Sequence, residues 1–264
     1  MTQGGFFPPP DEDPTKGIRS WVERLPPRAH TQWLLRHSLP GEQLAAIKDL
    51  LHRNQQAAAA TQIKFDELKA EIEANPDNER LDDIYDERFW KAVFMDSAHS
   101  MSAVGMLAPF IESLFVAIFE GLRKRQGSAA DDTRRQRADD QFWNPQIFFD
   151  KDSTKTNLVK GISQLAVSCG LQSFLPTDYE KSLSALFAYR NNMLHNGFEW
   201  PADTIRKFSN RIASEKWPED WFTSADRDGQ PWLYYMSPDF CAHCVDLIDG
   251  IIDGVGLYLK ERET

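Results

Sequence analysis

Apolar residues recur at helical spacing through most of the chain, and this periodicity restricts the fold more than any other feature of the sequence. In the central part, for example, Phe89, Val93, Leu107 and Ile111 fall on one face of a helix. No series of alternating strand patterns occurs, and the clearest hairpin signal is Asp228-Gly229. The sequence therefore predicts an all-α protein. The expected helical segments span residues 42–74, 86–122, 157–171, 177–195 and 238–260.

Proline and polar residues divide the chain into an N-terminal arm and a main helical domain. The arm, residues 1–85, begins with a proline-rich stretch and continues as one long helix or a helix pair. The main domain, residues 86–264, is expected to hold four core helices and an insertion at about 198–236. Pro109 is expected to kink the first of these helices. We interpret the polar stretch 123–140 as a solvated connector rather than a partner-binding segment.

End signals support several of these helices. Thr177 and Glu180 have the spacing of a capping box that would open the helix at 177–195. Ser237 and Pro238 are the residue types preferred at the N-cap and first position of a helix, here the last one. Gly197 predicts a left-handed cap where the preceding helix ends.

The composition restricts the classes of function. A hydrophobic content of 41% in 264 residues supports a sizeable core. The formal net charge of −10 disfavours a broad surface for nucleic acid or acidic membranes, but it is compatible with a small positive cleft. The three cysteines are an odd number and indicate no disulfide framework. The first residues lack the basic and apolar regions of a signal peptide, so we expect a cytoplasmic protein.

The segment 101–122 is long and apolar enough to raise the question of a membrane span. Pro109 and Glu112 lie within it, and helical patterning continues on both sides. We interpret the segment as a buried central helix and expect no membrane partner.

An arginine interrupts the apolar stripe of the helix expected at 177–195. Leu183, Leu186, Phe187 and Leu194 fall on this stripe, and Arg190 occupies a position where the pattern demands a core hydrophobe. A buried charge costs several kcal/mol unless it is paired or opens into a cleft. Arg190 therefore indicates either a cleft or an internal ion pair.

Two further polar residues accompany this arginine on the same helix. Asn191 and His195 lie four residues apart and stack on the adjoining face. His195 is in the last turn, where the helix dipole favours a protonated imidazole by about 0.3–1 kcal/mol. A guanidinium beside a titratable imidazole is suited to binding phosphate. The alternative is that Arg190 pairs with a core acid and His195 only caps the helix, and the residues alone do not separate these interpretations.

The segment from Arg190 to His195, RNNMLH, resembles the signature of HEPN domains. In that signature an arginine is followed by a polar residue, here Asn191, and then by a histidine after four to six residues. The place late in a third helix, with one long helix downstream, also resembles the HEPN arrangement. The resemblance covers residues 86–264 and implies an HEPN-like four-helix bundle. The N-terminal helical arm and the insertion between the third and fourth core helices have no counterpart in a minimal HEPN bundle.

This resemblance carries expectations about function. HEPN proteins are commonly homodimers whose two motifs meet across the interface, and many are metal-independent ribonucleases of toxin–antitoxin or antiviral defence systems. By resemblance, His195 would act as general acid or base in attack of the ribose 2′-hydroxyl, Arg190 would stabilise charge on the phosphate, and Asn191 would orient the pair. We expect an endoribonuclease that leaves 2′,3′-cyclic phosphate ends and needs no cofactor, with RNA as substrate and a protein antitoxin or regulator as a candidate partner. The alternative is a catalytically inactive HEPN-like module that binds a partner protein or RNA.

Other residues are candidates for contacts with substrate. The insertion interleaves aromatic and cationic residues, among them Arg206, Arg211, Trp232 and Tyr234, and such a pattern is typical of surfaces that stack unpaired bases. The same pattern is expected of a lid that packs on the bundle, and we favour the lid. His99 of the central helix is a further candidate for the same cleft, although a satisfied buried histidine is the more common case.

Two patterns in the last helix suggest other roles. Cys241 and Cys244 have the spacing of half a zinc site but fall on a core stripe and lack a second ligand pair, so we expect no metal there. Gly250 and Gly254 weaken a helix and therefore predict close approach of another helix, from the same chain or from a dimer mate. Three acids on one face are expected to be solvated: Asp246, Asp249 and Asp253.

Overall fold

The structure is a computed structural model that describes residues 21–126, 139–150 and 153–263, except 23 and 37. It is 76% helix, which confirms the expected mainly helical class. In chain order the elements are α2 (Pro27–Leu34), α3 (Pro40–Ala74), α4 (Glu79–Gln126), α6 (Asp139–Phe142), β1 (Ile147–Asp150), β2 (Ser153–Thr156), α7 (Leu158–Cys169), α8 (Tyr179–Asn196), α9 (Ala202–Ser214), β3 (Phe222–Arg227), β4 (Gln230–Met236) and α10 (Pro238–Glu263). Short 3-10 helices span Gln172–Phe174 and Glu219–Trp221.

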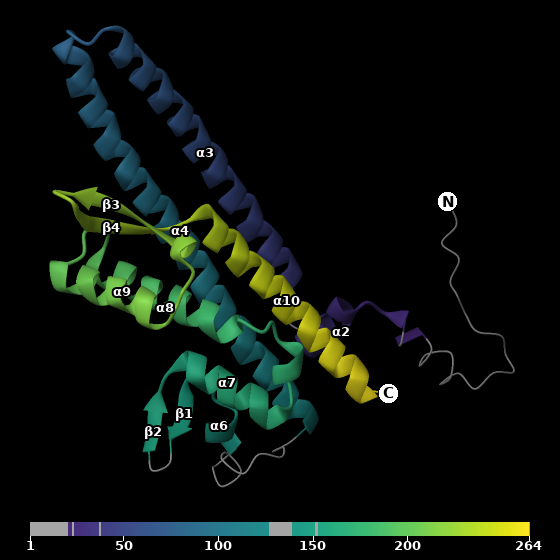
Figure 1. Cartoon of the computed structure of the whole chain (residues 1–264). Coiled ribbons are helices and arrows are strands. Elements are labelled where there is room, and N and C mark those ends of the chain that lie inside the picture. The colour runs from purple at the N-terminus through teal and green to yellow at the C-terminus, as the bar shows by residue number, and fades with distance from the viewer. Residues whose placement is uncertain (1–20, 23, 37, 127–138, 151–152, 264) are drawn as a thin grey trace, which may run out of the picture.

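The two longest helices, α3 and α4, form an antiparallel hairpin (Figure 1). The turn between them is Asn75-Pro76-Asp77-Asn78, which matches the break expected after residue 74. The boundary expected between residues 85 and 86 falls inside α4, because this helix begins at Glu79. The helix continues through Pro109. Most of the predicted connector, residues 127–138, lies outside the described residues.

The core lies where α4, α7, α8 and α10 meet. Phe115 of α4, Ile162 of α7, Leu186 of α8 and Ile251 of α10 are all fully buried in one hydrophobic cluster. Leu44 of α3 belongs to the same cluster. Helix α3, which belongs to the predicted arm, therefore contributes to the same packed core.

Helix α4 is long and apolar enough, by length and composition alone, to cross a bilayer. Of its most apolar 18-residue window, 56% is buried inside the protein. Leu107, Ile111 and Ile118 have no exposed surface, because α8 and α10 pack against this part of the helix. Burial against other helices accounts for the apolar character of this segment.

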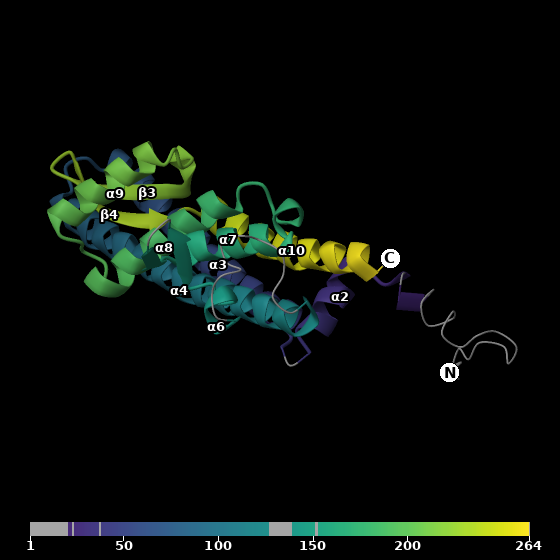
Figure 2. The ribbon, with the colours of Figure 1, turned by 90° about the horizontal axis from the view of Figure 1, so that it is seen from below.

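The glycines of α10 receive segments of the same chain, and this corrects the prediction of a helix–helix contact. A Cβ atom on Gly254 would collide with the backbone carbonyl of Phe174, and one on Gly250 would press on the ring of Pro176. Gly256 has the same relation to the carbonyl of Pro27, where α2 crosses the end of α10 (Figure 2). The close approach is therefore made by the end of the 3-10 helix Gln172–Phe174, by Pro176 after it and by the start of α2, and it gives no evidence for a dimer mate.

The insertion folds as α9 followed by the β3–β4 hairpin. Asp228 and Gly229 have φ angles of 53° and 73°, the positive values that a two-residue hairpin turn of type I′ requires. This confirms the hairpin signal in the sequence. The hydroxyl of Tyr189 in α8 donates a hydrogen bond of 2.9 Å to the carbonyl of Tyr234 in β4. The rings of Trp200 and Phe208 in the insertion pack against the ring of Tyr189, with centroids 5.6 and 6.1 Å apart, so the insertion is anchored on α8 by its aromatic side chains.

Helix starts agree only in part with the sequence signals. The amide of Phe240 donates 3.0 Å to Ser237 Oγ, which confirms the predicted N-cap of α10. Gly197 ends α8 and donates 2.9 Å to the carbonyl of Met193. Its φ of 72° is positive, as expected, but its ψ of −141° lies outside the left-handed helical region, so the predicted left-handed cap is wrong in its conformation. The capping box predicted for Thr177 and Glu180 is wrong. The helix begins at Tyr179, and the carboxylate of Glu180 accepts a hydrogen bond from Ser163 of α7 instead.

The acids of α10 hold α2 and α3 against that helix, which corrects the expectation that all of them are solvated. Arg28 of α2 donates to Asp249 at 2.5 Å and to Asp253 at 2.9 Å. Lys48 of α3 donates to the second carboxylate oxygen of Asp249 at 2.5 Å. Asp246 alone of the three is exposed.

Replacing Asp249 by asparagine is expected to lower the free energy of unfolding at pH 7 by about 1 kcal/mol, since the paired side chains remain partly exposed. Desolvation raises the pKa of Asp249, but hydrogen bonds from Lys48 and Arg28 outweigh it and leave the pKa below 3.8. Asp249 therefore makes its full contribution to the free energy of unfolding above about pH 3.8, and this contribution is lost as the pH falls through its lowered pKa. Urea unfolding of both proteins from pH 7 to pH 3 tests this. The control Asp246→Asn should change nothing, and an equal loss in both variants would contradict the prediction.

Candidate functional site

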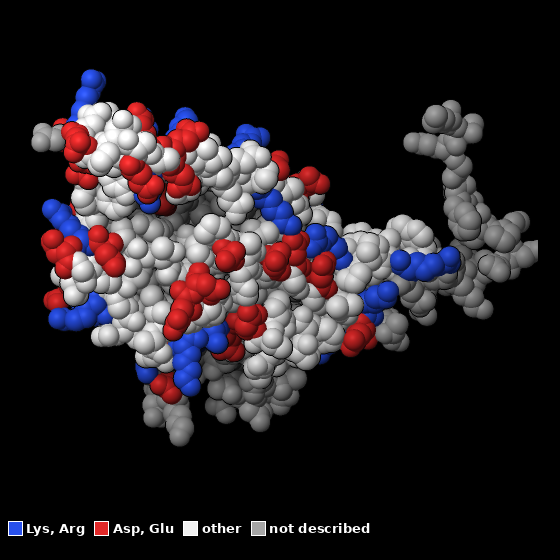
Figure 3. All heavy atoms as spheres, turned by 45° about the horizontal axis from the view of Figure 1, so that its top comes forward, with Lys and Arg blue, Asp and Glu red and all other residues white. Residues whose placement is uncertain are grey.

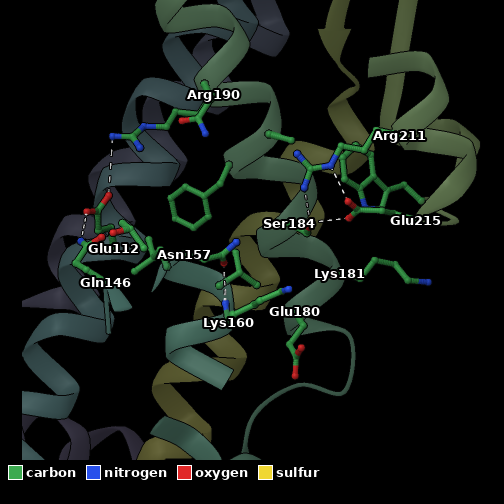
Figure 4. A pocket seen from close by; sticks show the side chains of 17 residues that line it. Glu112, Gln146, Asn157, Lys160, Glu180, Lys181, Ser184, Arg190, Arg211 and Glu215 are labelled. Carbon is green, nitrogen blue, oxygen red and sulfur yellow. Dashed lines mark hydrogen bonds and ion pairs between the residues drawn. The ribbon is translucent and has the colours of Figure 1, made fainter. Parts of the chain in front are cut away.

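A cleft of about 720 Å³ opens between α4, α7, α8 and α9. Figure 4 shows two interacting groups of side chains on opposite sides of the cleft. Arg190 and Glu112 lie on one side, and Arg211, Glu215 and Ser184 lie on the other. The cleft brings together three of the residues predicted from the sequence, Arg190, Asn191 and Arg211.

Arg190 lies where the buried part of α8 gives way to its exposed end. Its side chain is 31% exposed, and its Nη2 lies 3.9 Å from Oε2 of Glu112 in α4. The other Glu112 oxygen accepts a hydrogen bond of 2.6 Å from Gln146. The Nε of Arg190 is buried and has no hydrogen-bond partner in the part of the chain that the structure describes. This guanidinium is thus held by one long ion pair, and its Nε donor is unsatisfied among the described residues.

The remaining motif residues face different surroundings. Asn191 is exposed and lines the cleft. His195 is also exposed, in the last turn of α8, and is not among the residues that line the cleft. Leu194 is 58% exposed, so its predicted place on the core stripe is wrong, and Met193 is buried instead. Arg190 and His195 are five positions apart, which separates them by about 140° around the helix.

A hydrogen-bonded network fixes the opposite wall of the cleft. Arg211 Nε donates 2.6 Å to Glu215, and its Nη2 donates 3.0 Å to Ser184 Oγ. Ser184 in turn donates 2.6 Å to the other oxygen of Glu215. Desolvation raises the pKa of Glu215, but the hydrogen bonds from Ser184 and Arg211 outweigh it, and the net effect lowers the pKa. The carboxylate therefore stays ionised and holds the guanidinium over the ring of Trp217, at 5.2 Å.

The cleft has a small excess of positive charge in an acidic protein. Four cations line it, Lys160, Lys181, Arg190 and Arg211, against three acids, Glu112, Glu180 and Glu215. Over the face shown in Figure 3, the described acidic and basic side chains are interspersed and do not gather into one basic surface. The charge of the cleft thus suits a ligand with one or two phosphates more than a long duplex.

The other residues predicted to bind substrate lie elsewhere. His99 lines a second cleft, between α3, α4 and the start of α10, and not the one that holds Arg190. Arg206 is exposed on α9 and pairs with Asp203 at 2.7 Å. Tyr234 is buried, with its hydroxyl 2.7 Å from Ser209 Oγ. Trp232 packs edge-on against Trp90 at 5.4 Å. Within the insertion, these aromatic rings contact the rest of the protein as a lid would.

The cysteines of α10 are embedded in the protein. Burial raises the pKa of Cys241 to about 12 and also raises the pKa of Cys244. Both thiols therefore stay protonated at neutral pH. Among the described residues no group of three or more histidine, cysteine or acidic side chains is placed to hold a metal ion.

Sequence reasoning missed several residues of the cleft: Glu112, Gln146, Lys160, Lys181, Ser184 and Glu215. They come from α4, the turn before β1, α7, α8 and the residue after α9, and isolated polar or charged residues carry no local signal of a shared site. What the assembled groups can do is bind an anion, through the guanidinium of Arg190 and the amide of Asn191. Comparison of the chain with protein-family models, with curated proteins and with solved structures found no match.

Proposed function

We propose that this protein is a metal-independent endoribonuclease that acts as an HEPN-like homodimer. The observation that carries the proposal is the position of Arg190, which reaches into an open cleft with a buried, unpartnered Nε and a single ion pair of 3.9 Å. Asn191 lies beside it, and His195 follows one turn later at the exposed end of α8. The spacing of the three residues resembles the HEPN signature.

The chemistry of RNA cleavage matches these groups. RNA carries its own nucleophile, the ribose 2′-hydroxyl, so a metal ion is not required to generate one. A positioned imidazole accelerates such proton transfers by about 10²–10⁴-fold. The long contact with Glu112 is a weak interaction that a phosphate oxygen would replace, which leaves Arg190 to stabilise the charge that develops in the transition state.

In this proposal, a second copy of the chain completes the catalytic site. Arg190 extends into the cleft, whereas His195 lies outside it, so the two side chains of one chain do not converge on a common point. Leu194, adjacent to His195, exposes 58% of its surface, which is the kind of apolar group that an interface buries. In a two-fold dimer, the exposed end of one α8 would bring His195 to the cleft of the other chain.

If the protein acts as a single chain, the same site favours a different function. In a single chain His195 is away from the cleft, and Glu112 neutralises Arg190. These observations fit a catalytically inactive HEPN-like module in which the cleft binds a partner protein or RNA. The two functions differ in whether the wild-type protein breaks phosphodiester bonds.

We expect the purified protein to cut single-stranded RNA in an excess of EDTA and to leave 2′,3′-cyclic phosphate ends. An RNA with a single 2′-deoxynucleotide at the cleavage position should be inert there, because it lacks the nucleophile. Gel analysis of end-labelled substrates, with chemical identification of the ends, measures both results. Cleavage at the deoxy position would rule out this mechanism. Intact RNA under all conditions, together with retained RNA binding, would favour the inactive module.

A further inference from the structure

The second cleft of the protein lies on a different part of α4 from the first. It has a volume of about 500 Å³ and is bounded by α3, α4, the β3–β4 hairpin and the start of α10. Figure 1 shows these elements side by side along the α3–α4 hairpin. A smaller hollow of about 190 Å³ adjoins it, and the two share Ala58, Gln62, Asp96, His99 and Tyr235. These shared residues mark the centre of a continuous site.

Small and apolar side chains make the space. Ala58 and Ala59 belong to the alanine run of α3, and they line the cleft opposite Ala103 of α4. Leu51 and Met236 add buried apolar surface. The volume is in the range of sites for small molecules, about 300–1,000 Å³. Alanines in this run thus do more than favour the helix, because larger residues there would fill the cleft.

The polar groups at the centre of the cleft lack partners within the protein. The carboxylate of Asp96 forms no ion pair or hydrogen bond with the described residues, and neither does the hydroxyl of Tyr235. Asp96 is an exposed residue, but desolvation by the surrounding protein still raises the pKa of its carboxylate, and the charge of His99 only partly offsets this effect. Burial, followed by the negative charges of Asp96 and Asp226, raises the pKa of Tyr235 to about 12. Among the residues that the structure describes, no lysine or arginine lines either part of the cleft.

This pattern selects one class of ligand by charge. A phosphate or carboxylate group would meet Asp96 without any lysine or arginine to offset the repulsion. An entirely apolar ligand would bury the carboxylate further without a partner, which is costly. A protonated amine supplies the missing cation and also donates hydrogen bonds to the acceptors at the centre.

We propose that the second cleft binds a small molecule that joins a protonated amine to an apolar body, with the amine on Asp96 and Tyr235 and the body against the alanines of α3. This site is independent of the proposed ribonuclease function, because the two clefts have no lining residue in common. Each proposal can therefore fail without the other.

Dansylcadaverine is a suitable probe, since it carries a primary amine on an apolar, environment-sensitive fluorophore. Its N-acetyl derivative has the same body without the charge. With the full chain we expect saturable fluorescence enhancement by the amine, and about threefold to fivefold weaker binding of the acetylated probe, the effect of losing one exposed ion pair. Asp96→Asn should weaken binding of the amine by about the same factor and leave the acetylated probe unchanged.

Two further variants make the result specific. Asp86→Asn removes an acid from the same helix outside both parts of the cleft and should bind the amine as the wild type does. Ala58→Phe fills the centre of the cleft and should abolish binding of both probes, with circular dichroism to check the fold. If Asp86→Asn weakens binding as much as Asp96→Asn does, the probe is adsorbed on acidic surface and the proposal is wrong. Equal affinity for both probes in the wild type, or no saturable binding of the amine, also overturns it. Asp96→Asn is nearly isosteric, so the result does not depend on Ala58→Phe folding.

Discussion

Alanine in place of His195 is expected to slow RNA cleavage by about 10²–10⁴-fold. The fold should be unaffected, because the imidazole is exposed at the end of α8 and lies outside the hydrophobic core. The measurement is the initial rate of single-stranded RNA cleavage in EDTA, together with a thermal melt. Cleavage at the wild-type rate by this variant would exclude His195 from the reaction.

Alanine in place of Arg190 should cause a loss of at least similar size, since the guanidinium is the group placed to stabilise phosphate charge. Its effect on stability is expected to be within about 1 kcal/mol, because the lost ion pair is long and partly exposed. Arg206→Ala is the matched control. It removes an arginine from an exposed pair with Asp203, outside the cleft, and should leave cleavage unchanged.

Mixing the two inactive variants tests whether the site is shared between chains. If Arg190 of one protomer works with His195 of the other, a mixed dimer of Arg190→Ala and His195→Ala holds one intact site. Random exchange makes half of the dimers mixed, so about a quarter of the wild-type rate should return. If both residues act within one chain, mixing restores nothing. A monomer at micromolar concentration that still cuts RNA would also exclude the shared site.

The helices could be predicted because their signals are local. Periodicity placed α3, α7, α8 and α10 within a few residues of their observed ends, and Ser237 and Gly197 marked two of those ends correctly. The β3–β4 hairpin was also indicated, since Asp228-Gly229 suits the positive φ angles of its turn. The β1–β2 hairpin was missed. Its strands are four residues long, and the side chain of Gln164 in α7 holds the backbone of Phe149 with two hydrogen bonds of 2.9 Å, a contact that no local pattern reveals.

The candidate site could be predicted only where a residue breaks a pattern. Arg190 stood out because a charge replaced a hydrophobe on an apolar stripe. Its partner Glu112 lies on another helix and is an ordinary acid in the sequence, so the choice between a cleft and an ion pair could not be made. The structure shows a cleft and an ion pair together, since Arg190 and Glu112 both line the cleft. The alternation of aromatic and basic residues in the insertion was ambiguous for a similar reason, because packing on α8 and stacking of bases require the same side chains.

The glycines of α10 show a local signal that was recognised and given the wrong partner. Gly250 and Gly254 correctly predicted a close approach. A glycine inside a helix lowers the stability of that helix, so two of them suggest that another part of the protein lies too close for a side chain. The sequence could not tell a neighbouring α-helix from the short segment at residues 174–176, which is what the structure places there.

Gly254→Ala is expected to destabilise the protein by about 1–3 kcal/mol, in spite of the higher helix propensity of alanine. The added methyl group would collide with the backbone carbonyl of Phe174, which is held by the core and cannot rotate away as a flexible side chain would. Gly105→Ala is the matched control. It lies inside α4 with no atom within 4 Å of the position of the new methyl group. At this position the higher helix propensity of alanine should decide the outcome and stabilise the protein by up to about 1 kcal/mol.

Urea unfolding of the wild type and the two variants should therefore give changes of opposite sign for the same chemical substitution in a helix. If helix propensity alone mattered, both variants would be more stable than the wild type. If the glycines instead formed a groove for a second copy of the chain, Gly254→Ala would still be more stable than the wild type as a monomer. A loss at Gly254 that persists at low protein concentration would mean that the obstacle belongs to the same chain. Stabilisation of both variants would mean that the segment at 174–176 does not lie against α10, and the glycine pair would again be available to a second copy.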